Sequence, residues 1–312
     1  MGERSKKLGD HGEDIVAALL KLIGWKSAAK GTDLICFKPN IHGSKESPRK
    51  SHGVDFIFSC TSPLEDQILK HILISSKFQA ANYPNTPTTK FKDYFTDLSV
   101  ALECFKRSEI RRKVNSSHQG INSDSISGVL FWISGTDNPD ADIVEKVSTA
   151  RGVDDFGYGT IYVIDNSRAS FLFDSIGYTN NKYGEENVKF IYPSTGKNIN
   201  TASRVTGGKI LPPEYLNSGL IPFYASTQDQ KHLIVCCQDP FDENNLKRLI
   251  GFSISIALEY PKKVIIAFPD YDFVKHEEIV STTKLTLQDK SFAQSIEVIS
   301  YIKDFRGIEE DQ

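Results

Sequence analysis

The chain has 312 residues, of which 39% are hydrophobic and 25% charged, and its formal net charge is −3. This composition is ordinary for a globular protein and excludes an intrinsically disordered one, and the length allows one large or two medium domains. No apolar run approaches the roughly 18 residues of a membrane span, and the N-terminus lacks the apolar stretch of a secretory signal, so we expect a cytoplasmic protein without membrane contact.

Charge is distributed unevenly along the chain. Residues 1–120 hold 19 Lys and Arg against 13 Asp and Glu, whereas the remainder holds 18 against 27. A basic N-terminal part suggests a polyanionic partner, and an acidic remainder suggests a solvated body or a surface for another protein.

Cysteines and histidines give no local metal motif. The five cysteines are odd in number and sparse, which suits a reducing compartment. Adjacent Cys236 and Cys237 would point to opposite faces of a strand, so we expect two buried cysteines there and not a metal pair. His11, His42 and His52 lack i,i+4 or CxxC companions, which predicts that they do not bind zinc.

The first elements in chain order are one helix and three strands. Apolar residues of "GEDIVAALLKLIGW" share a helical face and Gly24 suits the helix end. Three short runs rich in Ile, Phe and Val follow, at 31–37, 52–60 and 71–78. The basic segment 38–53 between the first two is rich in Gly, Pro and Ser, and we expect it to face DNA.

The next elements alternate between helix and strand. One long helix is predicted over 90–114, followed by a strand at 128–134, a helix at 140–150, a strand at 159–165, a short helix at 167–176 and a strand at 188–194. The small polar residues of 194–208 predict a linker. We therefore expect a domain over 1–193 and a second, smaller α/β domain over 209–312, for partner binding or regulation.

Three residues on the first elements suit phosphodiester hydrolysis. The reaction needs a divalent metal, Mg²⁺ is held by carboxylates and other oxygens, and a nearby lysine can stabilise the transition state. Glu13 lies on the first helix, Asp55 on the second strand and Lys77 on the third.

On these residues the chain resembles the PD-(D/E)XK nuclease superfamily, which has the restriction endonuclease-like fold. The resemblance covers about residues 8–165 and implies an αβββαβ core with a central mixed sheet. It implies that Glu13 and Asp55 hold Mg²⁺ or Mn²⁺, with Asp55 in "GVD" as the metal-binding aspartate and Lys77 in "SSK" as the catalytic lysine.

Ser75 stands where this superfamily most often has Glu or Gln. Ser75 and Lys77 share one strand face, so a hydroxyl occupies the place of an acid. Some members with Ser-x-Lys supply the acid from the following helix. Three residues of the predicted helix could substitute for it here: Asp93, Asp97 and Glu103.

Each of these residues also has a purely structural interpretation. Asp10 and Glu13 have the spacing of a helix capping box, and Asp55 follows a glycine at a strand start, where turn-forming aspartates are common. Lys77 could simply face water. Asp33 repeats the Gly-x-Asp pattern, but the strand of Asp55 directly precedes that of Lys77.

Basic residues in two places are candidates for DNA binding. One group lies in the loop, Lys45, Arg49 and Lys50, and the other at the end of the predicted long helix, Arg107, Arg111, Arg112 and Lys113. The second group could bind phosphates or merely complement the helix dipole.

The combination predicts a Mg²⁺- or Mn²⁺-dependent DNA endonuclease. The resemblance implies a setting in bacterial restriction or anti-phage defence, with a protein partner or a homo-oligomer. The alternative is a nuclease-like subunit that has lost cleavage with its acid and keeps DNA binding or a scaffold role. A pure interaction module would leave Glu13, Asp55 and Lys77 without a role.

Overall fold

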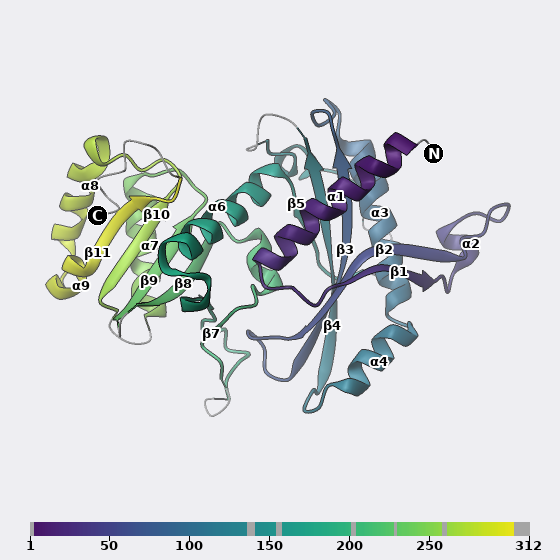
Figure 1. The fold of residues 1–312 in the computed structure, drawn as a ribbon, viewed down its shortest axis with the longest axis horizontal. Coiled ribbons are helices and arrows are strands. Elements are labelled where there is room, and N and C mark those ends of the chain that lie inside the picture. Colours follow the sequence, from purple (N-terminus) through teal and green to yellow (C-terminus); the bar gives the residue numbers. More distant parts are fainter. Residues whose placement is uncertain are drawn as a thin grey trace. The chain divides into compact units, whose positions relative to one another are not determined.

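The protein consists of two compact units, each with its own sheet (Figure 1). The computed structural model describes residues 3–135, 141–153, 158–200, 204–227, 230–257 and 261–302. The first unit is Met1–Ser170 with Thr195–Arg204, and the second is Phe171–Ser194 with Val205–Gln312. The division therefore falls inside helix α6 (Asn166–Tyr183), earlier than the predicted boundary, and much of the predicted linker belongs to the first unit.

A five-stranded mixed sheet forms the first unit. Strands β1 to β3 pair antiparallel, and β3 to β5 pair parallel, in the order β1-β2-β3-β4-β5. Their bounds are β1 Ala29–Ile35, β2 Ser51–Thr61, β3 Ile68–Gln79, β4 Ser123–Ser134 and β5 Ile161–Ile164. The predicted αβββαβ core with its central mixed sheet is confirmed.

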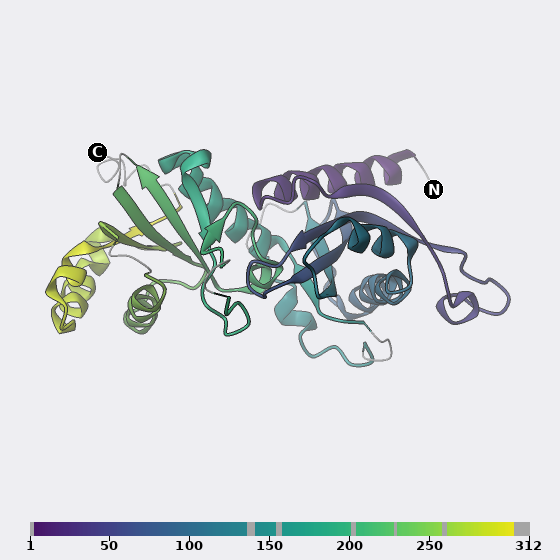
Figure 2. The same ribbon diagram turned by 90° about the horizontal axis from the view of Figure 1, so that it is seen from below.

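Two long helices cover the two faces of this sheet (Figure 2). Side chains alternate along a strand, so β3 presents Leu73 to a core formed with α3 (Thr88–Phe105) and Phe78 to α1 (Glu3–Leu22). Gly12 permits the approach of α1, because a Cβ there would lie 2.3 Å from Cβ of Phe78.

Two helix predictions need correction. Helix α1 already begins at Glu3, so Asp10 and Glu13 lie in its interior and the capping-box interpretation is wrong. The predicted helix over 90–114 is broken: α3 ends at Phe105, and α4 (Glu109–Ser117) begins after Ser108, whose hydroxyl accepts the backbone N–H of Arg111 at 3.1 Å. A serine in this role satisfies a backbone donor that a helix start leaves unpaired.

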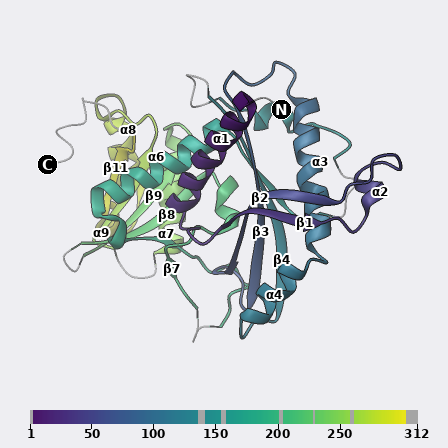
Figure 3. The ribbon, with the colours of Figure 1, turned by 45° about the vertical axis from the view of Figure 1, so that its right-hand side comes forward.

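The remaining helices of the first unit are short. Helix α2 (Pro39–His42) interrupts the connection between β1 and β2, beyond the ends of those strands (Figure 3). It has no buried residue. Helix α5 (Val144–Val147) occupies part of the predicted helix at 140–150, of which residue 140 lies outside the described residues.

The second unit has a six-stranded sheet in the order β11-β10-β9-β8-β6-β7. Its strands are β6 Val188–Ile191, β7 Gly207–Gly208, β8 Leu220–Thr227, β9 Gln230–Cys237, β10 Lys263–Phe268 and β11 Ile296–Ser300. Its helices after α6 are α7 Glu243–Ile256, α8 Phe273–Thr286 and α9 Lys290–Ser295. Strand β6, predicted to end the first domain, pairs with β8 here.

Adjacent Cys236 and Cys237 lie on opposite faces of β9, as predicted. Cys236 hydrogen-bonds to Thr179 of α6, whereas Cys237 belongs to the apolar core that contains Leu246 and Leu249 of α7. All five cysteines are buried and form no disulfide. Within the described parts of the chain, no helix is long and apolar enough to cross a membrane.

Candidate active site at the fork between β2 and β3

Strands β2 and β3 separate at Asp55. Their ladder runs from Thr61 and Leu69 to Phe56 and Ile74. Beyond that pair β2 continues along β1 as far as Ser51, and β3 continues along β4 as far as Gln79. The two strands therefore fork, and Asp55 and Ser75 are the first residues on either side of the opening.

The Asp55 carboxylate spans the start of this fork. Its Oδ2 accepts the backbone N–H of Ser76 at 2.6 Å, and the Ser75 side chain also hydrogen-bonds to it. Burial raises the pKa of Asp55, while the Ser76 hydrogen bond and the Lys77 charge act in the opposite direction. A partly buried carboxylate that depends on neighbouring positive charge suits a cation site.

Lys77 lies between the fork and helix α3 and does not simply face water. Its Nζ is 3.9 Å from Oδ2 of Asp97 and 5.5 Å from the centre of the Tyr94 ring. Only 28% of its side chain is exposed. The ammonium is thus held close enough to Asp55 to lower the pKa of that carboxyl.

Glu13 reaches the same neighbourhood from helix α1. It is near enough to Asp55 for its charge to raise the pKa of the aspartate. Its own Oε2 is 3.1 Å from Nζ of Lys30 on β1. The structure therefore brings Asp55, Ser75 and Lys77 together at the fork, whereas Glu13 acts on Asp55 through its charge and forms an ion pair with Lys30.

The three proposed substitute acids lie in different surroundings. Asp97 is beside Lys77 and also accepts a 2.6 Å hydrogen bond from Arg49, so two cations share its charge. Asp93 is exposed. Glu103 pairs with Lys38 and with His42, in a different cluster. Asp97 is thus an acid of α3 that lies beside Lys77.

Cys36, His42, His52 and Cys104 form a second polar cluster in this unit. One potential ligand atom from each lies within 4.8 Å of the others. The sequence shows no companion ligands near His42 and His52, but the structure brings both histidines together with two cysteines. His11 lies elsewhere, edge-on to Phe78. Local motifs could not find this cluster because Cys104 joins it only through the packing of α3. The available signal was the pair of histidines that flank a short loop just after Cys36.

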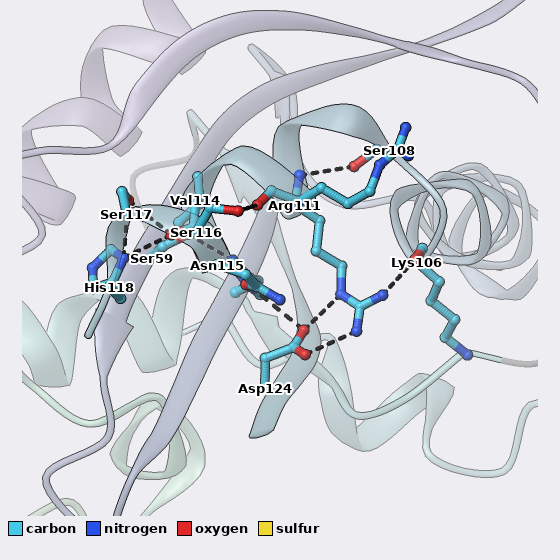
Figure 4. Close-up of polar contacts among 12 residues, drawn as sticks. Ser59, Lys106, Ser108, Arg111, Val114, Asn115, Ser116, Ser117, His118 and Asp124 are labelled. Atoms are coloured by element: carbon cyan, nitrogen blue, oxygen red, sulfur yellow. Dashed lines mark hydrogen bonds and ion pairs between the residues drawn. The ribbon is translucent and has the colours of Figure 1, made fainter. Parts of the chain in front are cut away.

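The two basic groups differ in how far their charges are already paired. Figure 4 shows the Arg111 guanidinium against Asp124, with Nε–Oδ2 and Nη2–Oδ1 distances of 2.6 and 2.8 Å and a further bond to the carbonyl of Lys106. Arg107 and Arg112 are exposed, and Lys113 pairs with Glu109. In the loop, Lys45 and Lys50 are exposed, whereas Arg49 binds Asp97.

The Arg111–Asp124 pair also connects to a buried histidine. Nε2 of His71 lies 2.7 Å from Oδ1 of Asn115, and the Asn115 side chain hydrogen-bonds to Asp124. Burial lowers the pKa of His71, and Arg111 lowers that of Asp124. Arg111 therefore has a structural role in joining α4 to β4.

Comparison with known proteins assigns the first unit. A family model described as the GAPS4 protein PD-(D/E)XK nuclease domain matches residues 1–168. The match confirms the resemblance stated from Glu13, Asp55 and Lys77, and it ends close to the boundary of the first unit at Ser170. No curated protein matches the chain significantly.

Proposed function

Since the chain belongs to the GAPS4 PD-(D/E)XK nuclease family, we propose that it is a metal-dependent DNA endonuclease of a bacterial restriction or anti-phage defence system. The observation that supports this proposal is the fork between β2 and β3. There the Asp55 carboxylate, the Ser75 hydroxyl and the Lys77 ammonium meet at the point where the sheet opens.

The donors at the fork fit a hard cation. Asp55, Ser75 and Glu13 offer carboxylate and hydroxyl oxygens, which are the ligands that Mg²⁺ and Mn²⁺ take in proteins. Asp55 and Glu13 would hold the ion, and the bound ion would activate water and offset charge on the phosphate.

Lys77 has the clearest role among the protein's own groups. A phosphodiester gains negative charge as water attacks, and a fixed ammonium stabilises that charge. Asp97 and the Tyr94 ring limit the positions that the lysine side chain can adopt. The Ser76 N–H in turn orients Asp55, so both groups are positioned before substrate arrives.

A plasmid cleavage assay with Mg²⁺ or Mn²⁺ tests the proposal. Asp55→Asn and Lys77→Met should abolish nicking, whereas Ser75→Ala should have a small effect because a hydroxyl is a weak ligand. Asp33→Asn is the matched control, since Asp33 has the same Gly-x-Asp context but is exposed on β1. Cleavage that survives both Asp55→Asn and Lys77→Met would refute this site.

The second candidate is a nuclease-like subunit that binds DNA without cutting it. It is favoured by Ser75 in the place of the acid and by the pairing of Asp97 with two cations. In that case the wild type is inert with either metal, and Ser75→Glu creates cleavage. If neither protein cuts DNA, even with a partner present, catalysis by this chain is excluded.

The fork lies in the first unit, and we propose that the second unit binds a protein partner, or a second copy of the chain, and controls the nuclease. Its own sheet and apolar core allow it to act as a separate module.

A further inference from the structure

Cys36, His42, His52 and Cys104 come from four different segments of the first unit. Cys36 directly follows β1, His42 ends α2, His52 lies near the start of β2 and Cys104 is in the last turn of α3. Cys36, His52 and Cys104 are buried, and the His42 side chain is 0% exposed. Four side chains with ligand atoms therefore converge in a largely buried place.

The three distances from His42 to the other members of this cluster match those between ligands of one tetrahedral metal ion, and all four ligand atoms lie within 4.8 Å of one another. Nδ1 of His42 lies 3.3 Å from Sγ of Cys36, 3.3 Å from Nε2 of His52 and 3.4 Å from Sγ of Cys104. Zinc binds nitrogen at about 2.0 Å and sulfur at about 2.3 Å, which places tetrahedral ligands roughly 3.3–3.8 Å apart.

Hydrogen bonds alone do not account for this arrangement. The Nδ1 atom of His42 faces two sulfurs and a second imidazole nitrogen, yet a ring nitrogen has either one proton or one lone pair to offer. A cation at the centre would use one lone pair from each of the four groups at once.

The surrounding groups prepare the ligands for a cation. Oε2 of Glu103 lies 2.8 Å from Nε2 of His42, which favours a proton on Nε2 and leaves the Nδ1 lone pair facing the cluster. Lys38 in turn pairs with Glu103. The backbone N–H of Phe37 points to Sγ of Cys104 at 3.4 Å, as a donor that would stabilise a thiolate. A carboxylate–histidine pair of this kind is typical behind a zinc ligand.

We propose that Cys36, His42, His52 and Cys104 bind one Zn²⁺ ion in a closed, structural site. Two thiolates and two imidazoles in a tetrahedral arrangement select zinc over Mg²⁺, which prefers oxygen ligands. Four protein ligands leave no position for water or substrate, so the ion takes no part in hydrolysis. The site is independent of the nuclease chemistry proposed at the fork.

The proposed zinc site would hold the connection between β1 and β2 in place. The connection between β1 and β2 contains α2, in which Pro39, Asn40 and Ile41 are exposed and the covered side chain is that of His42 itself, so apolar packing does not hold it. Zinc would tie both ends of this connection to α3. A pocket of about 120 Å³ lined by Phe37, Lys38, Lys106 and Arg107, among others, borders His42 and Cys104 and offers the ion a route from solvent.

The test is the metal content of the full chain, expressed with zinc in the medium and purified under reducing conditions. Elemental analysis should find about one zinc per chain, and X-ray absorption should show two sulfur and two nitrogen neighbours at about 2.3 and 2.0 Å. Replacing zinc with Co²⁺ should give thiolate-to-cobalt charge-transfer bands and the visible bands of a tetrahedral site. These wild-type measurements hold even if a ligand variant fails to fold.

Variants then identify the ligands. Cys104→Ser and His52→Ala should lose most of the zinc, whereas Cys60→Ser and His118→Ala should keep it, because Cys60 is a buried cysteine of β2 outside the cluster and His118 lies on the C-terminal side of α4. The proposal is overturned if reduced wild type holds no zinc, if Cys36 and Cys104 form a disulfide that resists mild reduction, or if Cys104→Ser keeps the sulfur and cobalt signatures of the wild type.

Discussion

Strand β2 carries two polar sites of opposite character only three residues apart. Asp55 lies at the fork with oxygen donors and a lysine around it, whereas His52 lies in a cluster of sulfur and nitrogen atoms. The fork is partly open, since 29% of the Glu13 side chain and 28% of that of Lys77 are exposed. The cluster is closed, since His52 has no exposed surface and Cys104 only 2%.

This difference follows from what each site has to do. A hydrolytic site must admit a phosphodiester and exchange its ion and waters, which suits a hard cation on a few oxygen ligands. A structural site must hold its ion through every turnover, which suits four soft ligands without an open position. One strand can serve both because its ladder with β3 ends at Phe56, so Asp55 and His52 both lie on the part of β2 that no longer pairs with β3.

The largest effect that separates the two sites is on cleavage. Asp55→Asn should reduce the cleavage rate by at least about 10²–10³-fold, the loss typical for one preorganised electrostatic group, and leave the zinc content unchanged. Cys104→Ser should remove zinc. Cleavage rate and zinc content are measured on the same preparations of both variants.

Two outcomes would contradict the separate roles proposed for the fork and the cluster. If Asp55→Asn also loses zinc, the fork and the cluster are one cooperative site. If Cys104→Ser keeps its zinc while Asp55→Asn cuts normally, neither site has the role proposed for it.

The sequence predicts the fork better than the cluster, for a physical reason. Asp55, Ser75 and Lys77 lie on consecutive strands whose apolar runs are visible, and a two-residue period puts Ser75 and Lys77 on one face. The cluster depends on where α3 packs, and no local pattern relates Cys104 to Cys36 or His52. The sequence leaves Glu103 as a possible substitute acid because it does not show which way that part of α3 faces. In the structure, Glu103 contacts His42 instead.

The boundaries of helices and the partners of strands are also poorly predicted where they depend on packing and not on local sequence. Apolar residues from Phe91 to Phe105 are followed by Ile110 at nearly helical spacing, which hides the break between α3 and α4. Ser108 followed by Glu109 was the available signal of a new helix. The assignment of β6 to the second sheet rests on its pairing with β8, a contact between distant parts of the chain that periodicity does not encode.

The next effect in size is on thermal stability. Removing zinc with a strong chelator should lower the melting temperature of the wild type by roughly 10 °C, because a ligand at about 1,000 times its dissociation constant contributes about 4 kcal/mol to the folded state. The measurement is a melting curve with and without chelator. Cys104→Ser should melt lower from the start and show little response to the chelator.

A matched control separates the two metals in this experiment. Removal of Mg²⁺ alone should leave the melting temperature nearly unchanged, because the proposed hard-cation site at the fork exchanges its ion. A wild-type melting curve that responds to Mg²⁺ and ignores the zinc chelator would reverse the roles given to fork and cluster.

The smallest expected effects distinguish structural from DNA-binding arginines on α4. Arg111→Ala should lower the free energy of unfolding by about 1.5–3 kcal/mol, the range for hydrogen bonds to charged groups, because it leaves Asp124 without its bidentate partner. Arg112 is exposed, so Arg112→Ala should leave stability nearly unchanged.

DNA binding and pH give the two readouts that separate these neighbouring variants. The slope of log K against log salt should fall by about 0.9 for each phosphate that the variant no longer neutralises, so Arg112→Ala should reduce it and Arg111→Ala should not. Arg111 lowers the pKa of Asp124, so the stability from this pair is present above the unfolded pKa of about 3.9 and is lost as pH falls through the lower folded value. The stability difference between wild type and Arg111→Ala, measured by denaturant titration, should therefore shrink in strong acid. A salt slope that changes in Arg111→Ala and not in Arg112→Ala would mean that DNA displaces Asp124 from its arginine.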